Sequence, residues 1–171
     1  MLNVRDFGGS YKGLIGECLF KFSHKYAVLT QLANPATYFD KRPYTLSETT
    51  KRFLIDNWTR IDAIEVLLDA SMNIREVNIY EVKTQNYDRE KAFSYMRPSV
   101  SFNVDAVFRA AARYGINAHL AKVFLLNDWS FDITISPYNS TDVFVCERPS
   151  YNDRNASKKW ARVSESGRGS R

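Results

Sequence analysis

The chain has 171 residues, of which 44% are hydrophobic and 14% aromatic, so it is long enough for one domain with a substantial core, and its composition excludes an intrinsically disordered protein. No apolar run approaches the roughly 20 residues of a membrane-spanning helix, and the N-terminus lacks the apolar stretch of a signal peptide, so we expect a soluble, cytoplasmic protein with no membrane partner. The net charge of +5 lies entirely in residues 154–171, because residues 1–153 hold eighteen basic and eighteen acidic residues.

A first helix is predicted near the N-terminus. Residues 3–10 have the composition of a loop, and Ser10 is a suitable N-cap for a helix over residues 11–29. Apolar residues recur at helical spacing in this segment and predict its buried stripe: Ile15, Cys18, Leu19, Phe22 and Tyr26.

A second helix is predicted over residues 46–57, after two proline-containing steps that interrupt the first pattern. Thr45 and Glu48 have the spacing of a capping box, in which each side chain accepts a hydrogen bond from a backbone N–H at the start of a helix. The apolar residues of this segment that share one face are Leu46, Phe53 and Leu54.

The next segment predicts a β-hairpin. Residues 60–69 are rich in branched apolar side chains and are typical of a strand, residues 70–73 are typical of a turn, and residues 76–83 form the return strand. If the turn is centred between residues 71 and 72, Asp62 lies directly across from Glu81, with Cβ atoms roughly 4.5–5.5 Å apart.

A helix over residues 103–114, ended by Gly115, follows the hairpin. Two more strands are predicted over residues 120–126 and 131–135. The first of these is almost continuously apolar, which indicates an interior strand covered on both faces. The order of elements predicts an α/β fold with a central mixed sheet of four or more strands flanked by helices.

The hairpin gathers residues that suit phosphodiester chemistry. Lys83 lies two residues beyond Glu81 and projects from the same face, whereas Val82 points to the other face. Two carboxylates as close as Asp62 and Glu81 repel each other, and a divalent cation relieves that repulsion. Mg²⁺ prefers oxygen ligands and takes one or two protein carboxylates, and Mn²⁺ is expected to substitute for it. Such an ion polarises a phosphodiester and lowers the pKa of bound water, while Lys83 could stabilise the developing charge.

The order of Asp62, hairpin and Glu81-Val82-Lys83 resembles the motif of the PD-(D/E)XK nuclease superfamily, with Ile61 where many members have proline. The likeness is greatest to the archaeal Holliday-junction resolvase branch. Those proteins begin with a basic, glycine-rich segment and a helix that carries a glutamate, similar to residues 9–13 and Gly16-Glu17 here. A helix ending in Ala-Arg-Tyr-Gly at residues 112–115, followed by two strands, is also similar.

This resemblance implies a restriction-endonuclease-like core over residues 1–153 and a DNA partner. It implies that Asp62 and Glu81 are metal ligands, that Lys83 is the catalytic lysine, and that Glu17 completes the site from the first helix. Residues implied to contact nucleic acid within the domain are Ser10, Lys12 and Gln85.

Other acids and the soft ligands offer weaker sites. Glu and Lys that alternate on a strand commonly form a solvated face, and the hairpin carries further acids. Asp69 lies roughly 23 Å from Asp62 along the strand, and Glu65 points to the opposite face. The cysteines match neither a disulfide framework nor a zinc motif, and both histidines are expected to be structural or exposed.

The tail over residues 154–171 is expected to be flexible and to bind polyanions, because it holds six basic residues against one glutamate. A solvated tail that only aids solubility is the alternative. Its predicted nucleic-acid contacts are Lys158, Lys159 and Arg162.

The expected function is therefore Mg²⁺-dependent cleavage of DNA, on branched DNA such as a Holliday junction. The alternatives are a single-strand, repair or mobile-element (viral) DNA nuclease of the same fold, or a nucleic-acid-binding module that does not cleave. A homodimer in solution would favour the resolvase alternative, because symmetric cutting of a four-way junction needs two active sites related by a two-fold axis.

Overall fold

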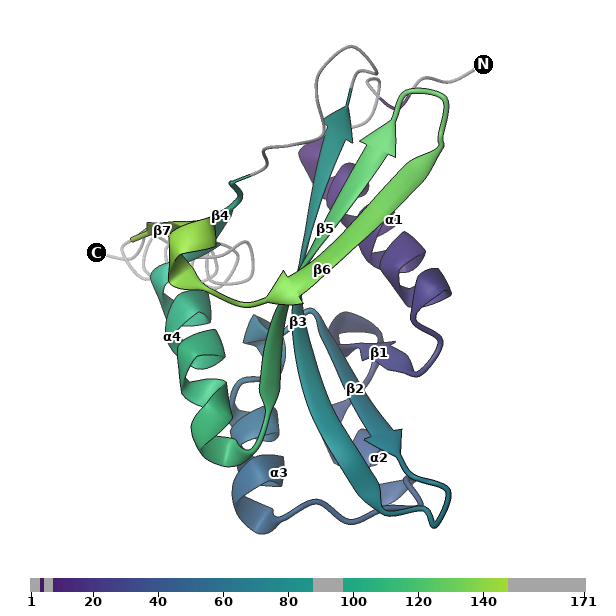
Figure 1. The fold of residues 1–171 in the computed structure, drawn as a ribbon, viewed down its shortest axis with the longest axis vertical. Helices are drawn as coiled ribbons and strands as arrows, with labels where there is room; N and C mark the ends of the chain where they lie inside the picture. Colours follow the sequence, from purple (N-terminus) through teal and green to yellow (C-terminus); the bar gives the residue numbers. More distant parts are fainter. Residues whose placement is uncertain (1–3, 5–7, 88–96, 148–171) are drawn as a thin grey trace, which may run out of the picture.

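The computed structural model describes residue 4 and residues 8–87 and 97–147. The predicted tail, with Lys158, Lys159 and Arg162, lies outside these residues. A five-stranded sheet has the strand order β1-β2-β3-β5-β6, and a two-stranded sheet pairs β4 with β7 (Figure 1). The strands are β1 Ala27–Leu29, β2 Ala63–Leu68, β3 Ile74–Tyr87, β4 Ser99–Ser101, β5 Asn117–Leu126, β6 Phe131–Pro137 and β7 Phe144–Cys146. The α-helices are α1 Gly9–Ser23, α2 Pro35–Asp40, α3 Glu48–Asp56 and α4 Phe102–Ala110.

The central sheet is mixed. Strand β2 pairs antiparallel with β1 and β3, β3 pairs parallel with β5, and β5 pairs antiparallel with β6. This confirms the predicted α/β class with at least four mixed strands flanked by helices, and it is compatible with a restriction-endonuclease-like core. Strand β5 lies between β3 and β6, as its continuous apolar character predicts.

Two apolar clusters lie on opposite faces of the sheet. The larger cluster joins α3 and α4 to alternate residues of β2, β3 and β5, including Ile64, Ile79 and Leu120. The smaller cluster joins Phe20 of α1 to the strand residues that point to the opposite face, including Ala63 and Val82. Figure 1 shows α4 to one side of the sheet and α1 to the other. The helices therefore sandwich the sheet, and strands β1, β2, β3 and β5 contribute side chains to both layers.

The first helix differs from its prediction. It ends at Ser23, its N-cap is Gly8 rather than Ser10, and residues 27–29 form a strand. The predicted buried stripe is largely wrong: Cys18 is exposed and Phe22 is 83% exposed, whereas Gly16 and Phe20 are the buried residues of α1. Of the predicted stripe, Leu19 packs against the same cluster as Phe20.

The close approach of α1 to β3 explains this difference. A Cβ added to Gly16 would overlap Thr84 Oγ1 and would lie 2.8 Å from Thr84 Cβ. The helix therefore rests on the sheet through its smallest residue, and the apolar side chains on its other side face outward. The spacing of apolar residues identified a helix but not the face that it buries.

Helices α3 and α4 follow the predictions for residues 46–57 and 103–114 more closely. Ser47, not Thr45, caps α3, and its side chain accepts a hydrogen bond from the N–H of Thr50. Helix α4 continues as a 3₁₀ turn over Ala111–Tyr114, and Gly115 ends it in the left-handed conformation with φ of 69°. That conformation is the one in which glycine is favoured after a helix, so the predicted stop is confirmed.

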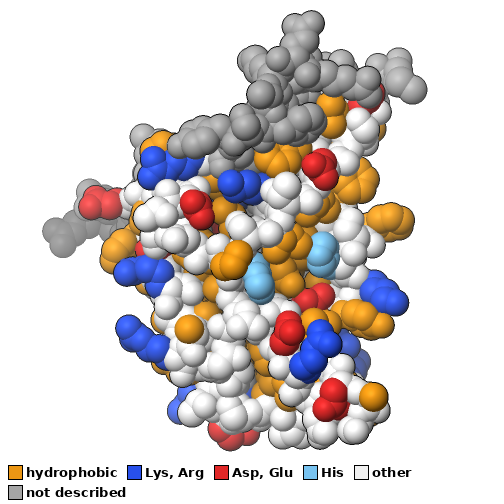
Figure 2. Space-filling model, in the orientation of Figure 1, with side chains coloured by type: hydrophobic (Ala, Val, Ile, Leu, Met, Phe, Trp, Pro, Cys, Tyr) orange, Lys and Arg blue, Asp and Glu red, His pale blue; other side chains and the backbone are white. Residues whose placement is uncertain are grey.

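The face shown in Figure 2 carries interspersed acidic and basic side chains together with exposed apolar ones. This mixture agrees with the neutral charge balance of residues 1–153. Among the helices that the structure describes, none has the length and apolar character that crossing a bilayer requires.

Candidate active site

The hairpin has the predicted register. Ala63 pairs with Tyr80 and Ile64 with Ile79, and the ladder keeps this offset until an irregularity between Leu67 and Leu68 beside the turn. Continuing the register by one step places Asp62 opposite Glu81.

Beside Ala63, the side chain of Asp62 takes the place of a backbone carbonyl as the hydrogen-bond acceptor for β3. The N–H of Asp62 donates to the carbonyl of Tyr80 at 3.2 Å, and the N–H of Val82 donates to Asp62 Oδ2 at 2.8 Å. The carboxylate of Asp62 is therefore held against β3 at the point where β2 begins. These two hydrogen bonds to the backbone of β3 therefore fix the position of the Asp62 carboxylate.

Glu81 and Lys83 share one face of β3. Glu81 is 5% exposed and Lys83 is half-buried, and Lys83 Nζ lies 2.7 Å from Glu81 Oε1. Val82 packs into the cluster on the other face. The predicted alternation of side chains is thus confirmed.

Glu17 reaches this group from α1. Its carboxylate accepts a hydrogen bond from Gln31 Nε2. Burial first, and then the negative charge of Glu81, raises the pKa of Glu17 to about 7, while Lys83 and Gln31 oppose the shift. The structure therefore brings Glu17 together with the hairpin acids.

Burial and the neighbouring charges shift the pKa values of Asp62 and Lys83. Burial, followed by the charges of Glu81 and Glu17, raises the pKa of Asp62 well above its usual range. Burial disfavours the charged form of Lys83, but Glu81, Asp62 and Glu17 together hold the pKa of its ammonium above the ordinary value. The arrangement concentrates negative charge around one amine.

Two residues that sequence analysis did not connect with the site fix the backbone beside Asp62. The Thr30 hydroxyl donates to the carbonyl of Ile61, and the Thr30 N–H donates to the carbonyl of Asp62 at 3.0 Å. The indole N–H of Trp58 donates to the carbonyls of Thr30 and Ala33 at 2.9 and 3.1 Å. The sequence carries no signal for this network, because its members come from separate segments.

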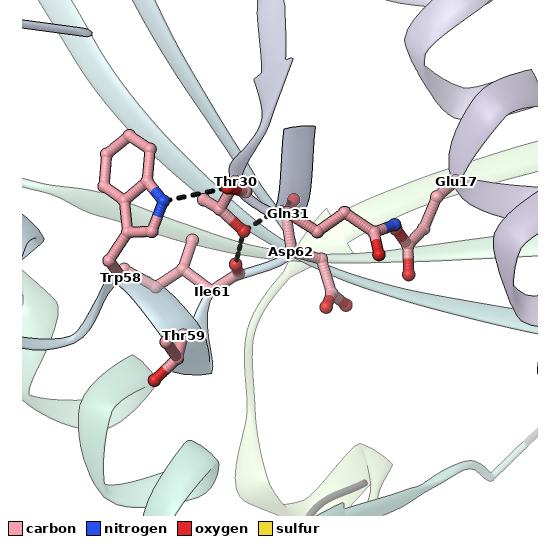
Figure 3. Close-up of a pocket in the computed structure, with 7 residues that line it drawn as sticks. All are labelled: Glu17, Thr30, Gln31, Trp58, Thr59, Ile61 and Asp62. Atoms are coloured by element: carbon pink, nitrogen blue, oxygen red, sulfur yellow. Dashed lines mark hydrogen bonds between the residues drawn. The ribbon is translucent and has the colours of Figure 1, made fainter. Parts of the chain in front are cut away.

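A pocket of about 370 Å³ opens at this point, and Figure 3 shows the carboxylates of Glu17 and Asp62 facing the same space. The pocket lies between the segment after β1, the 3₁₀ turn before β2, and α1. Its lining residues are Glu17, Thr30, Gln31, Trp58, Thr59, Ile61 and Asp62.

The remaining predicted residues lie at the edges of the site. Gln85 is half-buried on β3 and, by strand alternation, shares the face of Lys83. Ser10 is exposed and Lys12 half-buried in the first turn of α1, more than one helical turn before Glu17. The structure therefore does not bring Ser10 and Lys12 into the carboxylate group.

The acids predicted to lie outside the site, Glu65 and Asp69, form hydrogen bonds elsewhere in the hairpin. Glu65 is buried on the opposite face, where its carboxylate accepts hydrogen bonds from Tyr80 OH at 2.8 Å and Asn78 Nδ2 at 3.2 Å. Asp69 lies in the turn, where it accepts hydrogen bonds from the N–H groups of Ser71 and Asn73. Both acids have structural partners of their own.

The donor set suits a hard divalent cation. In the part of the chain that the structure describes, no group of three or more His, Cys, Asp or Glu side chains is arranged to hold a metal ion. Mg²⁺, however, commonly takes one or two protein carboxylates and fills its other positions with water and phosphate oxygens. Asp62 and Glu81, with Glu17 beside them, supply carboxylate ligands of the kind and number that Mg²⁺ commonly takes from a protein.

In comparisons with known proteins, the chain matches no family model, no curated protein and no solved structure.

Proposed function

We propose that the protein is a metal-dependent endonuclease of the PD-(D/E)XK type that hydrolyses phosphodiester bonds of DNA. The observation that supports this most is the gathering of Asp62, Glu81 and Lys83 at the start of the hairpin, with Glu17 supplied by α1. A buried group of carboxylates in which the pKa values of Asp62 and Glu17 are raised is costly for folding unless it serves a purpose.

Each residue has a role that its position supports. Asp62 and Glu81, assisted by Glu17, would hold Mg²⁺ or Mn²⁺. When bound, the ion supplies Lewis acidity toward the phosphate and a more acidic water. Lys83, already oriented by Glu81, donates hydrogen bonds to negative charge that develops on the phosphate oxygens. Gln31 orients Glu17, and the backbone N–H of Val82 orients Asp62.

The test is a cleavage assay with Mg²⁺ on four-way junction, flap, single-stranded and duplex DNA. We expect cleavage of at least one substrate, with Mn²⁺ able to replace Mg²⁺, and with Ca²⁺ supporting binding but little turnover. Preference for the junction would favour the resolvase alternative, and preference for another form would favour a repair or mobile-element nuclease. Undiminished cleavage in excess EDTA would contradict the proposal, and binding without cleavage of any substrate would favour a non-cleaving module.

The matched variants are Asp62→Asn and Glu81→Gln, which keep the size and an oxygen acceptor but remove the charge. We expect each to lower the single-turnover rate by roughly two orders of magnitude or more, the loss typical of removing a group that stabilises a transition state. Asp69→Ala, an acid of the same hairpin outside the site, should cleave normally. Full activity of Glu81→Gln would end the proposed assignment of the site.

A further inference from the structure

The proposed nuclease site is poor in available positive charge. When ionised, Glu17, Asp62 and Glu81 carry three negative charges, and the ammonium of Lys83 is already paired with Glu81 at 2.7 Å. A DNA phosphate that approaches such a site is repelled unless another cation lies nearby. A phosphate contact beside Lys83 therefore requires a further basic side chain.

Lys122 lies on the strand next to Lys83 at the same height. In the parallel pairing of β3 with β5 the two lysines are register partners. Paired residues on neighbouring strands, about 4.8 Å apart, project from the same face of a sheet. The packing agrees: Leu120 belongs to the cluster on the side of α4, whereas Ala121 packs with Val82 on the side of α1.

Within the described residues, the surroundings of Lys122 offer no counter-charge to its ammonium. The residue is half-buried, beside the buried Phe124, and its register partner on β6 is the exposed Thr134. Among the described residues, no carboxylate forms an ion pair with its ammonium. Asp132, the acid on the same face of β6, accepts a hydrogen bond from the N–H of Ile133 at 2.9 Å. A partly buried cation without a counter-charge is unfavourable, and a bound anion would remove that cost.

We propose that Lys122 binds a backbone phosphate adjacent to the scissile one. The inference rests on the proposed function, since it takes Lys83 as the residue that acts on the scissile phosphate. Lys122 then places a second ammonium one strand further toward β6, where no described carboxylate forms an ion pair with it. The compact ammonium of lysine suits a single phosphate oxygen, whereas a bidentate contact would call for arginine.

The test measures DNA binding and cleavage separately for Lys122→Met, which keeps most of the side-chain length and apolar stem but removes the charge. With a duplex oligonucleotide in Ca²⁺, we expect about tenfold weaker binding, as for loss of one charge-assisted hydrogen bond. The slope of log K against log salt should fall by about 0.9, the value for one phosphate contact. The rate at saturating DNA with Mg²⁺ should fall less than the affinity does, because Lys83 is the residue that acts on the scissile phosphate.

Two control variants make the result specific. Lys122→Arg keeps the charge and should restore most of the affinity and the slope. Lys41→Met removes an exposed lysine at the end of α2 and should change neither. An unchanged slope in Lys122→Met, or an equal fall in Lys41→Met, would overturn the inference. Absence of cleavage in the unaltered protein would count against the nuclease proposal alone, because the binding measurements decide on Lys122 without turnover.

Discussion

The acids of the hairpin show how single residues acquire different roles within one short segment. Glu65 is buried and accepts hydrogen bonds from Tyr80 and Asn78. Asp69 accepts hydrogen bonds from backbone N–H groups of the turn, and Asp62 faces Glu81. The strand alternation decides which acid faces which side, and the distance from the turn decides which one meets Glu81. The chemistry of the three carboxylates is therefore set by position and not by residue type.

Asp69 offers a test of stability that is separate from the site. The N–H of Asn73, and then that of Ser71, holds the pKa of Asp69 below its usual range. Because folding lowers this pKa, the stabilisation is fully present above the pKa of the unfolded chain and is lost as the pH falls through the lower pKa of the folded protein. Asp69→Ala should therefore lower the melting temperature at neutral pH, and this difference should shrink below about pH 4. Thermal melts at several pH values measure it, and a difference that persists unchanged at pH 2 would contradict it.

At the scale of elements, the contact between α1 and β3 depends on one glycine. Gly16→Ala should destabilise the fold by about 1–3 kcal/mol, the usual cost of overpacking, because its Cβ would overlap Thr84. Gly13 is the matched control in the same helix: nothing lies within 4 Å of an added Cβ there, so Gly13→Ala should be neutral or stabilise by up to about 1 kcal/mol. Denaturant unfolding of both variants decides the point, and equal stabilities would show that the two elements are not closely packed.

The segment after β1 and the start of β2 are joined through Trp58. Trp58→Phe removes the indole N–H that binds the carbonyls of Thr30 and Ala33, and it should cost about 1–2 kcal/mol of stability. If the network also positions Asp62, the variant should lower kcat more than it raises KM. Trp129→Phe, in the turn between β5 and β6, is the matched control and should leave both constants near those of the unaltered protein. An increase in KM with an unchanged kcat would argue that Trp58 acts on substrate binding instead.

At the scale of the whole molecule, the net positive charge is confined to the last residues of the sequence. Residues 1–153 are neutral, and residues 154–171 carry the net charge of +5. If the tail contacts phosphates, truncation after Asp153 should weaken DNA binding regardless of sequence. Loss of three contacts would lower the slope of log K against log salt by nearly three. Cleavage at saturating DNA should survive, because the proposed catalytic residues all precede Gln85. Binding at several salt concentrations measures the change, and an identical slope would leave the tail a solvated appendage.

The sequence by itself determined the hairpin, its register and the common face of Asp62, Glu81 and Lys83. These features are local: a short turn sets the pairing, and a period of two sets the faces. It also determined the interior position of β5 and the stop at Gly115, because both depend on the character of a few consecutive residues.

Only the tertiary structure decided which side of α1 is buried and what holds the site in place. Helical spacing marked the exposed Cys18 and Phe22 and missed the buried Phe20. Thr84, the residue that selects Gly16, lies far along the chain. The contacts of Gln31 with Glu17 and of Trp58 with Thr30 likewise join segments that no local pattern connects. Local periodicity describes what one element can bury, whereas the partner that it meets is decided by the packing of the whole fold.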